Sequence, residues 1–201
     1  MKTTFILLLL VVTGEPLSQN YLYEKGASGF HIAGQLGASS GSTLLGIRPG
    51  YTFNGKFTLG LVLGSEHLSD VDINSTAIRP YLDFIVLKQG ENDAPVSINL
   101  GTHYQHNSFP KLSGLSLSTF GISANLLHSI VAGNSTLIVP RIGVVWDRST
   151  IDLLGITASE NSIGVGLSTA AKVNNLYIEP GVSFIKGGAQ FGVSIGVVFV
   201  Q

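Results

Sequence analysis

The sequence predicts an all-β protein, a closed antiparallel up-and-down transmembrane β-barrel, with ten strands preferred and eight as the alternative. Three observations support this fold class. About ten runs of roughly 9–12 residues place apolar side chains at every second position, as expected of strands with one face toward lipid. Only 11% of the residues are charged, whereas soluble proteins carry about 25%. Mean hydropathy is positive, yet no run after the N-terminus is long and apolar enough for a transmembrane helix.

The chain begins with a pattern typical of a secretory signal. Lys2 precedes a short apolar run at residues 5–12. A membrane anchor is the alternative, but this run is too short to cross a bilayer as a helix, which takes about 20 residues. We therefore expect residues 1–19 to form a signal peptide, cleaved near Ser18, and residues 20–201 to form a single outer-membrane barrel domain.

Five strands are expected in the first half of that domain, at residues 29–38, 43–53, 56–64, 76–87 and 96–106. Each alternates apolar with small or polar side chains, so one face meets lipid and the other meets the lumen. The third is the most regular, because Phe57, Leu59, Leu61 and Leu63 occupy its odd positions. Asn54-Gly55, directly before it, is the strongest short hairpin signal in the chain.

Five more strands are expected at residues 115–127, 136–146, 162–172, 176–185 and 189–200, again from alternation. Turn residues such as Asn174-Asn175 separate them. In the first of these strands the alternation changes phase between Leu117 and Phe120, which predicts a β-bulge.

The connections between the expected strands alternate in length. Long polar connections lie at residues 65–75, 107–114 and 147–161, and tight turns lie between them. Bacterial outer-membrane barrels have long outside loops and short periplasmic turns, so we expect these three connections to face outside and both termini to lie in the periplasm. The short connection at 186–188 leaves eight strands as the alternative.

The end of the chain carries a family resemblance. It reads Ser194-Ile195-Gly196-Val197-Val198-Phe199-Val200-Gln201. This ending resembles the C-terminal assembly signal of bacterial outer-membrane barrels, although Gln201 stands where that family usually has an aromatic residue. The whole barrel region resembles small OmpA/OmpX-type barrels of Gram-negative bacteria. The resemblance implies location in the cell outer membrane, contact with its lipid, and insertion by the barrel-assembly machinery through the C-terminal strand.

Four strands share a proline beside a charged residue, in Arg48-Pro49, Arg79-Pro80, Pro140-Arg141 and Glu179-Pro180. Parity puts the prolines on the lipid face and the charges inside, with Asp83 in phase with Arg79. An arginine that faces lipid costs about 2–4 kcal/mol, whereas inside it can pair. We interpret Arg48, Arg79, Asp83, Arg141 and Glu179 as a lumen ionic cluster that fills a narrow barrel. The alternative is a pore constriction or an anion site.

The same prolines conflict with a regular sheet, because proline cannot donate to a strand ladder. They require local bulges, or positions whose N–H would not have formed a hydrogen bond.

One stretch allows an enzymatic interpretation. Tyr104-Gln105-His106-Asn107-Ser108 resembles the His-x-Ser element of outer-membrane lipid A 3-O-deacylases, in which histidine activates a serine nucleophile. Those enzymes have asparagine after the serine, where this chain has Phe109, and an acid about a dozen residues on, which this chain lacks. We therefore interpret His106 and Ser108 as polar loop residues, with a deacylase-like enzyme as an alternative function.

Composition argues against other classes of function. The net charge of −1 does not favour nucleic acid, and the absence of cysteine excludes disulfides and thiol catalysis. His103 and His106 should lie on opposite strand faces, so we expect no metal site and no cofactor. The sequence predicts a non-enzymatic outer-membrane barrel with a structural or surface-interaction role, or alternatively a small porin-like channel or solute-binding barrel. It leaves the oligomeric state open.

Overall fold

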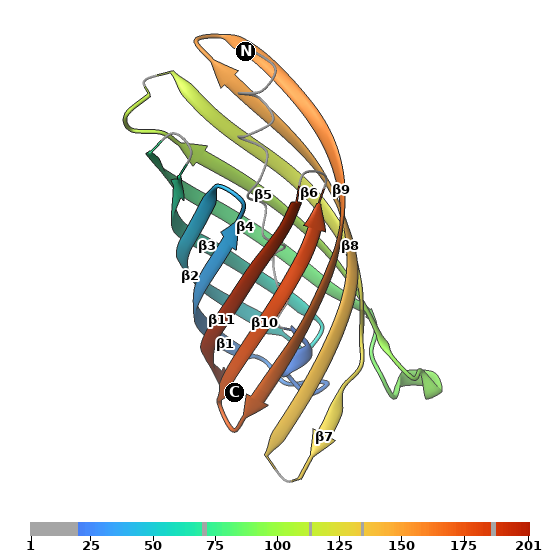
Figure 1. Ribbon diagram of the computed structural model, residues 1–201. Coiled ribbons are helices and arrows are strands. Elements are labelled where there is room, and N and C mark those ends of the chain that lie inside the picture. Colours follow the sequence, from blue (N-terminus) through green and yellow to red (C-terminus); the bar gives the residue numbers. More distant parts are fainter. Residues whose placement is uncertain (1–19, 70–71, 113, 134, 186–187) are drawn as a thin grey trace.

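The computed structural model shows a closed barrel of antiparallel strands (Figure 1). It describes residues 20–69, 72–112, 114–133, 135–185 and 188–201. The expected signal peptide, residues 1–19, lies outside the described residues.

The strands are β1 Gly29–Ser39, β2 Ser42–Phe53, β3 Phe57–Leu68, β4 Ile73–Leu87, β5 Ser97–Ser108, β6 Leu115–Leu127, β7 Ile130–Ala132, β8 Thr136–Leu153, β9 Ile156–Val173, β10 Leu176–Ile185 and β11 Gly188–Val200. Two short 3-10 turns, η1 Asn20–Leu22 and η2 Glu91–Asp93, complete the elements.

Ten of these strands form the barrel wall. Each pairs with its neighbour in the sheet, and β1 pairs with β11. β6 pairs directly with β8, and the short strand β7 pairs with the proximal start of β8. β1 and β11 are in register from Gly29–Val200 to Ser39–Gln190, so the first and last strands close the sheet. The predicted ten-strand fold is confirmed. Among the described residues, no helix is long and apolar enough to cross a membrane.

The two ends of the barrel differ, and we name them by their residues. The proximal end holds Gln201 and the Asn54-Gly55 and Asn174-Asn175 turns, and the distal end holds the β3–β4, β5–β6 and β8–β9 hairpins. The β8–β9 hairpin rises highest at the distal end (Figure 1). β8 and β9 remain paired up to Leu153–Ile156, so most of the expected connection at 147–161 is strand. That expected loop is wrong, because β8 stays paired with both β6 and β9 up to Leu153.

The outer face of the wall is apolar and the inner face is largely polar. Leu45, Leu59 and Ile122 point outward with exposures of 65%, 52% and 49%, which would be unfavourable in water. Aromatic side chains gather on this face toward the proximal end, where the ring centroids of Tyr51 and Phe53 lie 4.6 Å apart. This distribution fits lipid around the wall and headgroups near the aromatic rings.

The predicted bulge in the sixth strand is wrong. β6 pairs with β5 and β8 in continuous register across Leu117 and Phe120. The phase change arises because Leu115 and Leu117 point inward, where they pack with Phe109 in a small apolar cluster. Apolar residues on the lumen face therefore change the apolar alternation in the sequence in the same way as a β-bulge would.

Three of the four prolines lie at gaps in the strand ladder without any change of register. Each proline keeps its pairing on one side, as Pro49 does opposite Ile32. On the other side the pairing stops before the charge–proline step and resumes after it, from Ile47–Leu63 to Gly50–Gly60, from Ile78–His106 to Tyr81–His103 and from Ile178–Ala171 to Gly181–Ser168. The proline nitrogen thus meets an interruption of the ladder, and the sheet needs no bulge at these positions.

Candidate functional site

The five charged residues that the sequence assigned to the lumen are all buried inside the barrel. Arg48, Arg79, Asp83, Arg141 and Glu179 expose between 0% and 6% of their surface. Strand parity fixes this orientation, because each residue alternates with a lipid-facing neighbour. The structure divides them between two groups, one around Arg48 and one around Arg79.

In the first group, Arg48 and Glu179 form a buried ion pair. A guanidinium nitrogen of Arg48 lies 3.7 Å from a carboxylate oxygen of Glu179. The Ser168 hydroxyl donates to the other Glu179 oxygen at 3.3 Å, and the Asn99 amide donates to Asp83 at 3.5 Å. The acids are thus held by neutral donors as well as by arginine, which a buried carboxylate requires.

The second group contains acids that the sequence analysis missed. Arg79 lies within electrostatic reach of Asp147 and Glu66. Asp147 is also 3.4 Å from His103, and the Asn107 amide donates to Glu66 at 2.8 Å. Both acids fell in expected connections because the expected strands ended too early. Two more residues of alternation beyond 56–64 would have placed Glu66 on the inner face.

Glycines opposite the large inward side chains make room for them. A Cβ atom at Gly60 would overlap the ring of Tyr81, and one at Gly50 would overlap His31. His31 and Tyr81 are hydrogen bonded at 3.2 Å, and both are almost fully buried. The many glycines of the sequence therefore include positions that allow a narrow lumen to be filled.

The N-terminal segment lies inside the proximal end of the barrel. Tyr21, Leu22 and Tyr23 expose 4%, 1% and 2% of their surface and form an apolar cluster with inward residues such as Tyr177 and Val198. The Lys172 ammonium donates to the Leu22 carbonyl at 2.9 Å. A cavity of about 640 Å³ remains beside this segment at the proximal mouth.

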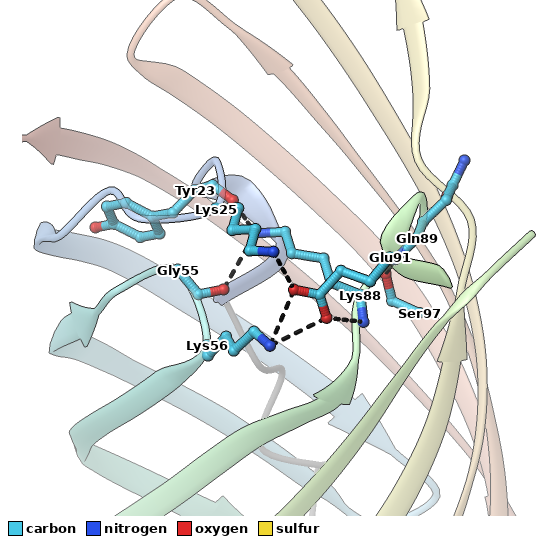
Figure 2. A network of polar contacts seen from close by, with 8 residues as sticks. All are labelled: Tyr23, Lys25, Gly55, Lys56, Lys88, Gln89, Glu91 and Ser97. Carbon is cyan, nitrogen blue, oxygen red and sulfur yellow. Dashed lines mark hydrogen bonds and ion pairs between the residues drawn. The ribbon is translucent and has the colours of Figure 1, made fainter. Parts of the chain in front are cut away.

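A cluster of lysines around Glu91 fastens this segment to the rim (Figure 2). The Glu91 carboxylate forms ion pairs with Lys25 at 2.9 Å and Lys56 at 3.0 Å, which joins the N-terminal segment to the β2–β3 and β4–β5 turns. The Lys88 ammonium donates to the carbonyls of Tyr23 at 2.6 Å and Gly55 at 3.1 Å. We call these residues the proximal clamp.

The electrostatics of the clamp follow from these contacts. Hydrogen bonds from Lys25 and Lys56 lower the pKa of Glu91 to about 2, so its carboxylate is charged at neutral pH. Burial lowers the pKa of Lys88 to about 8, although its ammonium group donates hydrogen bonds to two carbonyls. The clamp carries both signs of charge at neutral pH, which favours the docked segment.

The candidate catalytic residues lie on the outer face of the wall. His106 and Ser108 are both exposed on β5, and His103 points the opposite way into the lumen. The His106 ring contacts the hydroxyl of Ser118 at 3.2 Å, and this hydroxyl also accepts from Tyr104 at 3.1 Å. The structure therefore joins His106 to β6 rather than to Ser108. Among the described residues, no group of three or more His, Cys, Asp or Glu could hold a metal ion.

Comparisons with known proteins find similarity among solved structures. No family model and no curated protein matches it. Solved structures similar to it include the N-terminal barrel of Pseudomonas aeruginosa OprF, at 12% identity over 87% of this chain and 98% of that one, with a TM-score of 0.39. Neisserial surface protein A matches at 15% identity over 86% and 94%, with a TM-score of 0.42. Ail of Yersinia pestis matches at 9% identity over 89% and 100%, with a TM-score of 0.37.

These likenesses concern the fold alone. The assignment rests on the wall itself, in which ten strands close without an edge, large apolar side chains face outward, and charges are buried inside. The chain is a transmembrane β-barrel of the bacterial outer-membrane type.

Proposed function

We propose that this protein is a non-enzymatic outer-membrane barrel with a closed lumen and a structural or surface-interaction role. The observation that carries the proposal is the buried N-terminal segment. Tyr21, Leu22 and Tyr23 occupy the proximal end of the lumen, beside the buried Arg48–Glu179 pair. A conducting pore needs a continuous path of water, and these side chains stand in that path.

The distal hairpins supply the surface for interaction. The β8–β9 hairpin extends past the end of β10, whose pairing with β9 stops at Ile185–Gly164, and it ends at Leu154 and Gly155. Leu153, Leu154 and Ile156 expose 48%, 78% and 76% of their surface at its tip. β6 stays paired with β8 up to Leu153, and the Leu154 N–H donates to the Gly114 carbonyl at 3.0 Å. An exposed apolar tip held in this way favours contact with a protein or lipid surface.

The enzymatic alternative has less support. A serine nucleophile needs a histidine base that a third group orients. The ring of His106 contacts the Ser118 hydroxyl, which also accepts a hydrogen bond from Tyr104. Neither partner is a carboxylate that could orient His106 as a base. We therefore prefer a binding or structural role to lipid deacylation.

Single-channel conductance of the refolded protein in a planar bilayer tests the closed lumen. We expect a quiet trace from the wild type, because the N-terminal segment and the buried charges fill the barrel. Tyr21→Ala combined with Tyr23→Ala should introduce current steps by opening the proximal end. Regular steps from the wild type, unchanged in this variant, would contradict the proposal and favour the channel.

A further inference from the structure

A second cavity lies in the lumen, apart from the one at the proximal mouth. It measures about 60 Å³ and lies beneath the β1–β2 hairpin. A single water needs about 10–15 Å³ of accessible volume, so this cavity is larger than the space of one trapped water. Its wall includes Arg141, Ser168 and four glycines, among them Gly37, Gly181 and Gly192.

Strand pairing arranges these five residues in a row across the inner face. Arg141 of β8 opposes Ser168 of β9, which opposes Gly181 of β10. Gly181 opposes Gly192 of β11, which opposes Gly37 of β1. The row presents one guanidinium, one hydroxyl and then three positions without side chains. The floor of the cavity is therefore bare backbone next to a cation.

Two glycines of this row, Gly37 and Gly192, differ from those that make room for packed side chains. A Cβ at Gly60 would overlap Tyr81, whereas a Cβ at Gly192 would only touch the Leu36 carbonyl at 3.6 Å. A Cβ at Gly37 would meet Leu44 at 3.6 Å, also an ordinary contact. Packing does not require glycine at positions 37 and 192. These glycines leave space in front of Arg141 that larger residues would fill.

The chemistry of the wall selects the ligand. Of the described residues that line the cavity, Arg141 is the one with a charge, and it is 94% buried. The Gln35 and Gln190 amides, which carry N–H donors, line the same cavity, and the Ser183 hydroxyl donates to Gln190 at 3.4 Å. A guanidinium fork beside amide groups matches an oxyanion, because phosphate and carboxylate accept paired N–H bonds.

The cavity reaches the distal rim of the barrel at the β1–β2 hairpin. Ser39 and Ser42, on either side of the β1–β2 turn, belong to its wall. The β1–β2 hairpin ends well below the β8–β9 hairpin (Figure 1). A solute that arrives from the distal side meets these serines before it meets Arg141. The proximal clamp lies at the other end, so the cavity and the closed lumen are compatible.

We propose that this cavity is a binding site for a small oxyanion of phosphate size, held by Arg141 and admitted from the distal end. The inference goes beyond the closed-barrel function and does not rest on it. Arg141 also lies within electrostatic reach of Asp83, so a bound anion adds a second acceptor to its surroundings. The same chemistry exists on a free phosphate and on a phospholipid headgroup, and the experiment distinguishes them.

Isothermal titration calorimetry on the full barrel in a phosphate-free maltoside detergent tests the site. Inorganic phosphate and short-chain phosphatidylglycerol serve as separate probes. Arg141→Gln removes the cation, and Gly192→Val fills the cavity without touching Arg141. Gly34→Val is the matched control, because Gly34 points outward on β1 and a Cβ there would meet only the Ile195 carbonyl at 4.0 Å.

We expect saturable binding of phosphate by the wild type. Binding should weaken about tenfold or more in Arg141→Gln, which loses a charge-assisted contact, and in Gly192→Val, which fills the cavity. Gly34→Val should bind like the wild type. Binding of phosphatidylglycerol alone, with the same response to the variants, would support the site and identify a headgroup as the ligand. Absence of binding by both probes, or binding unchanged in Gly192→Val, would overturn the proposal. A heat-induced shift in gel mobility confirms that each variant is folded.

Discussion

Arg48 and Glu179 form an ion pair inside the barrel although two strands, β1 and β11, separate them in the sheet. Their charged atoms lie 3.7 Å apart, and both side chains are closed to solvent. Closure of the sheet makes this contact possible, because inward residues of strands that are not neighbours meet across the lumen. The pair therefore links β2 to β10 through side chains alone.

Glu179→Gln should destabilise the barrel, because it leaves Arg48 buried without its carboxylate partner. Breaking a buried pair typically costs about 3–5 kcal/mol, so we expect a loss of this order in chemical unfolding. Asp93→Asn, at an exposed acid in the η2 turn, is the control and should change stability by less than about 0.5 kcal/mol. Equal behaviour of the two variants would mean that Glu179 takes no part in an ionic pair.

Arg48→Met combined with Glu179→Leu tests the same contact from the opposite direction. Replacing both partners removes two desolvated charges together, so the double variant should lose less stability than the sum of the single variants. We expect a coupling energy of about 1 kcal/mol or more in a double-mutant cycle. Additive losses would show that the two residues act independently.

Tyr21→Ala should release the N-terminal segment while leaving the wall intact. Truncation of a buried aromatic side chain costs about 3–5 kcal/mol. Here we expect that loss in the free energy with which the segment docks against the barrel. Trypsin should then cleave after Lys25 more than tenfold faster than in the wild type, because cleavage requires local opening. Tyr104→Ala, at an outward tyrosine, is the control. No change in cleavage after Tyr21→Ala would show that the segment is held by the clamp alone.

The proximal clamp should weaken in acid. Glu91 has a pKa of about 2 in the folded protein, below its ordinary value of 4.5, so its stabilisation is complete above pH 4.5 and disappears as the pH falls through 2. The melting temperature of the wild type should therefore approach that of Glu91→Gln over this interval. Equal melting temperatures of the two proteins at pH 7 would contradict the role of Glu91.

Cysteine labelling can establish which end faces outside. The chain contains no cysteine, so a single introduced thiol gives an unambiguous signal. Gly155→Cys, at the tip of the β8–β9 hairpin, should react with a membrane-impermeant maleimide on intact cells. Asn175→Cys, in a proximal turn, should react only after lysis. The reverse result would invert the proposed orientation.

The sequence alone determined the wall of this protein. Alternation of apolar and polar residues, as in Phe57 to Leu63, fixes strand faces because the side-chain period of a strand is two. It also fixed the inward direction of Arg48 and Glu179, since parity extends along each strand. The alternation failed where lumen residues are apolar, as at Leu117, and where a strand continues through polar residues, as β8 does at Asp147.

Only the tertiary structure decided which inward residues meet. Strand parity gives a direction but not a partner, and partners depend on shear and closure of the barrel. The Arg48–Glu179 pair and the approach of Asp147 to His103 join strands that are not neighbours in the sheet. The row from Arg141 to Gly37 is completed only by the pairing of β11 with β1. The entry of Tyr21 and Tyr23 into the lumen left no periodic signal, because a short segment that enters a preformed barrel is placed by packing and by the Glu91 clamp.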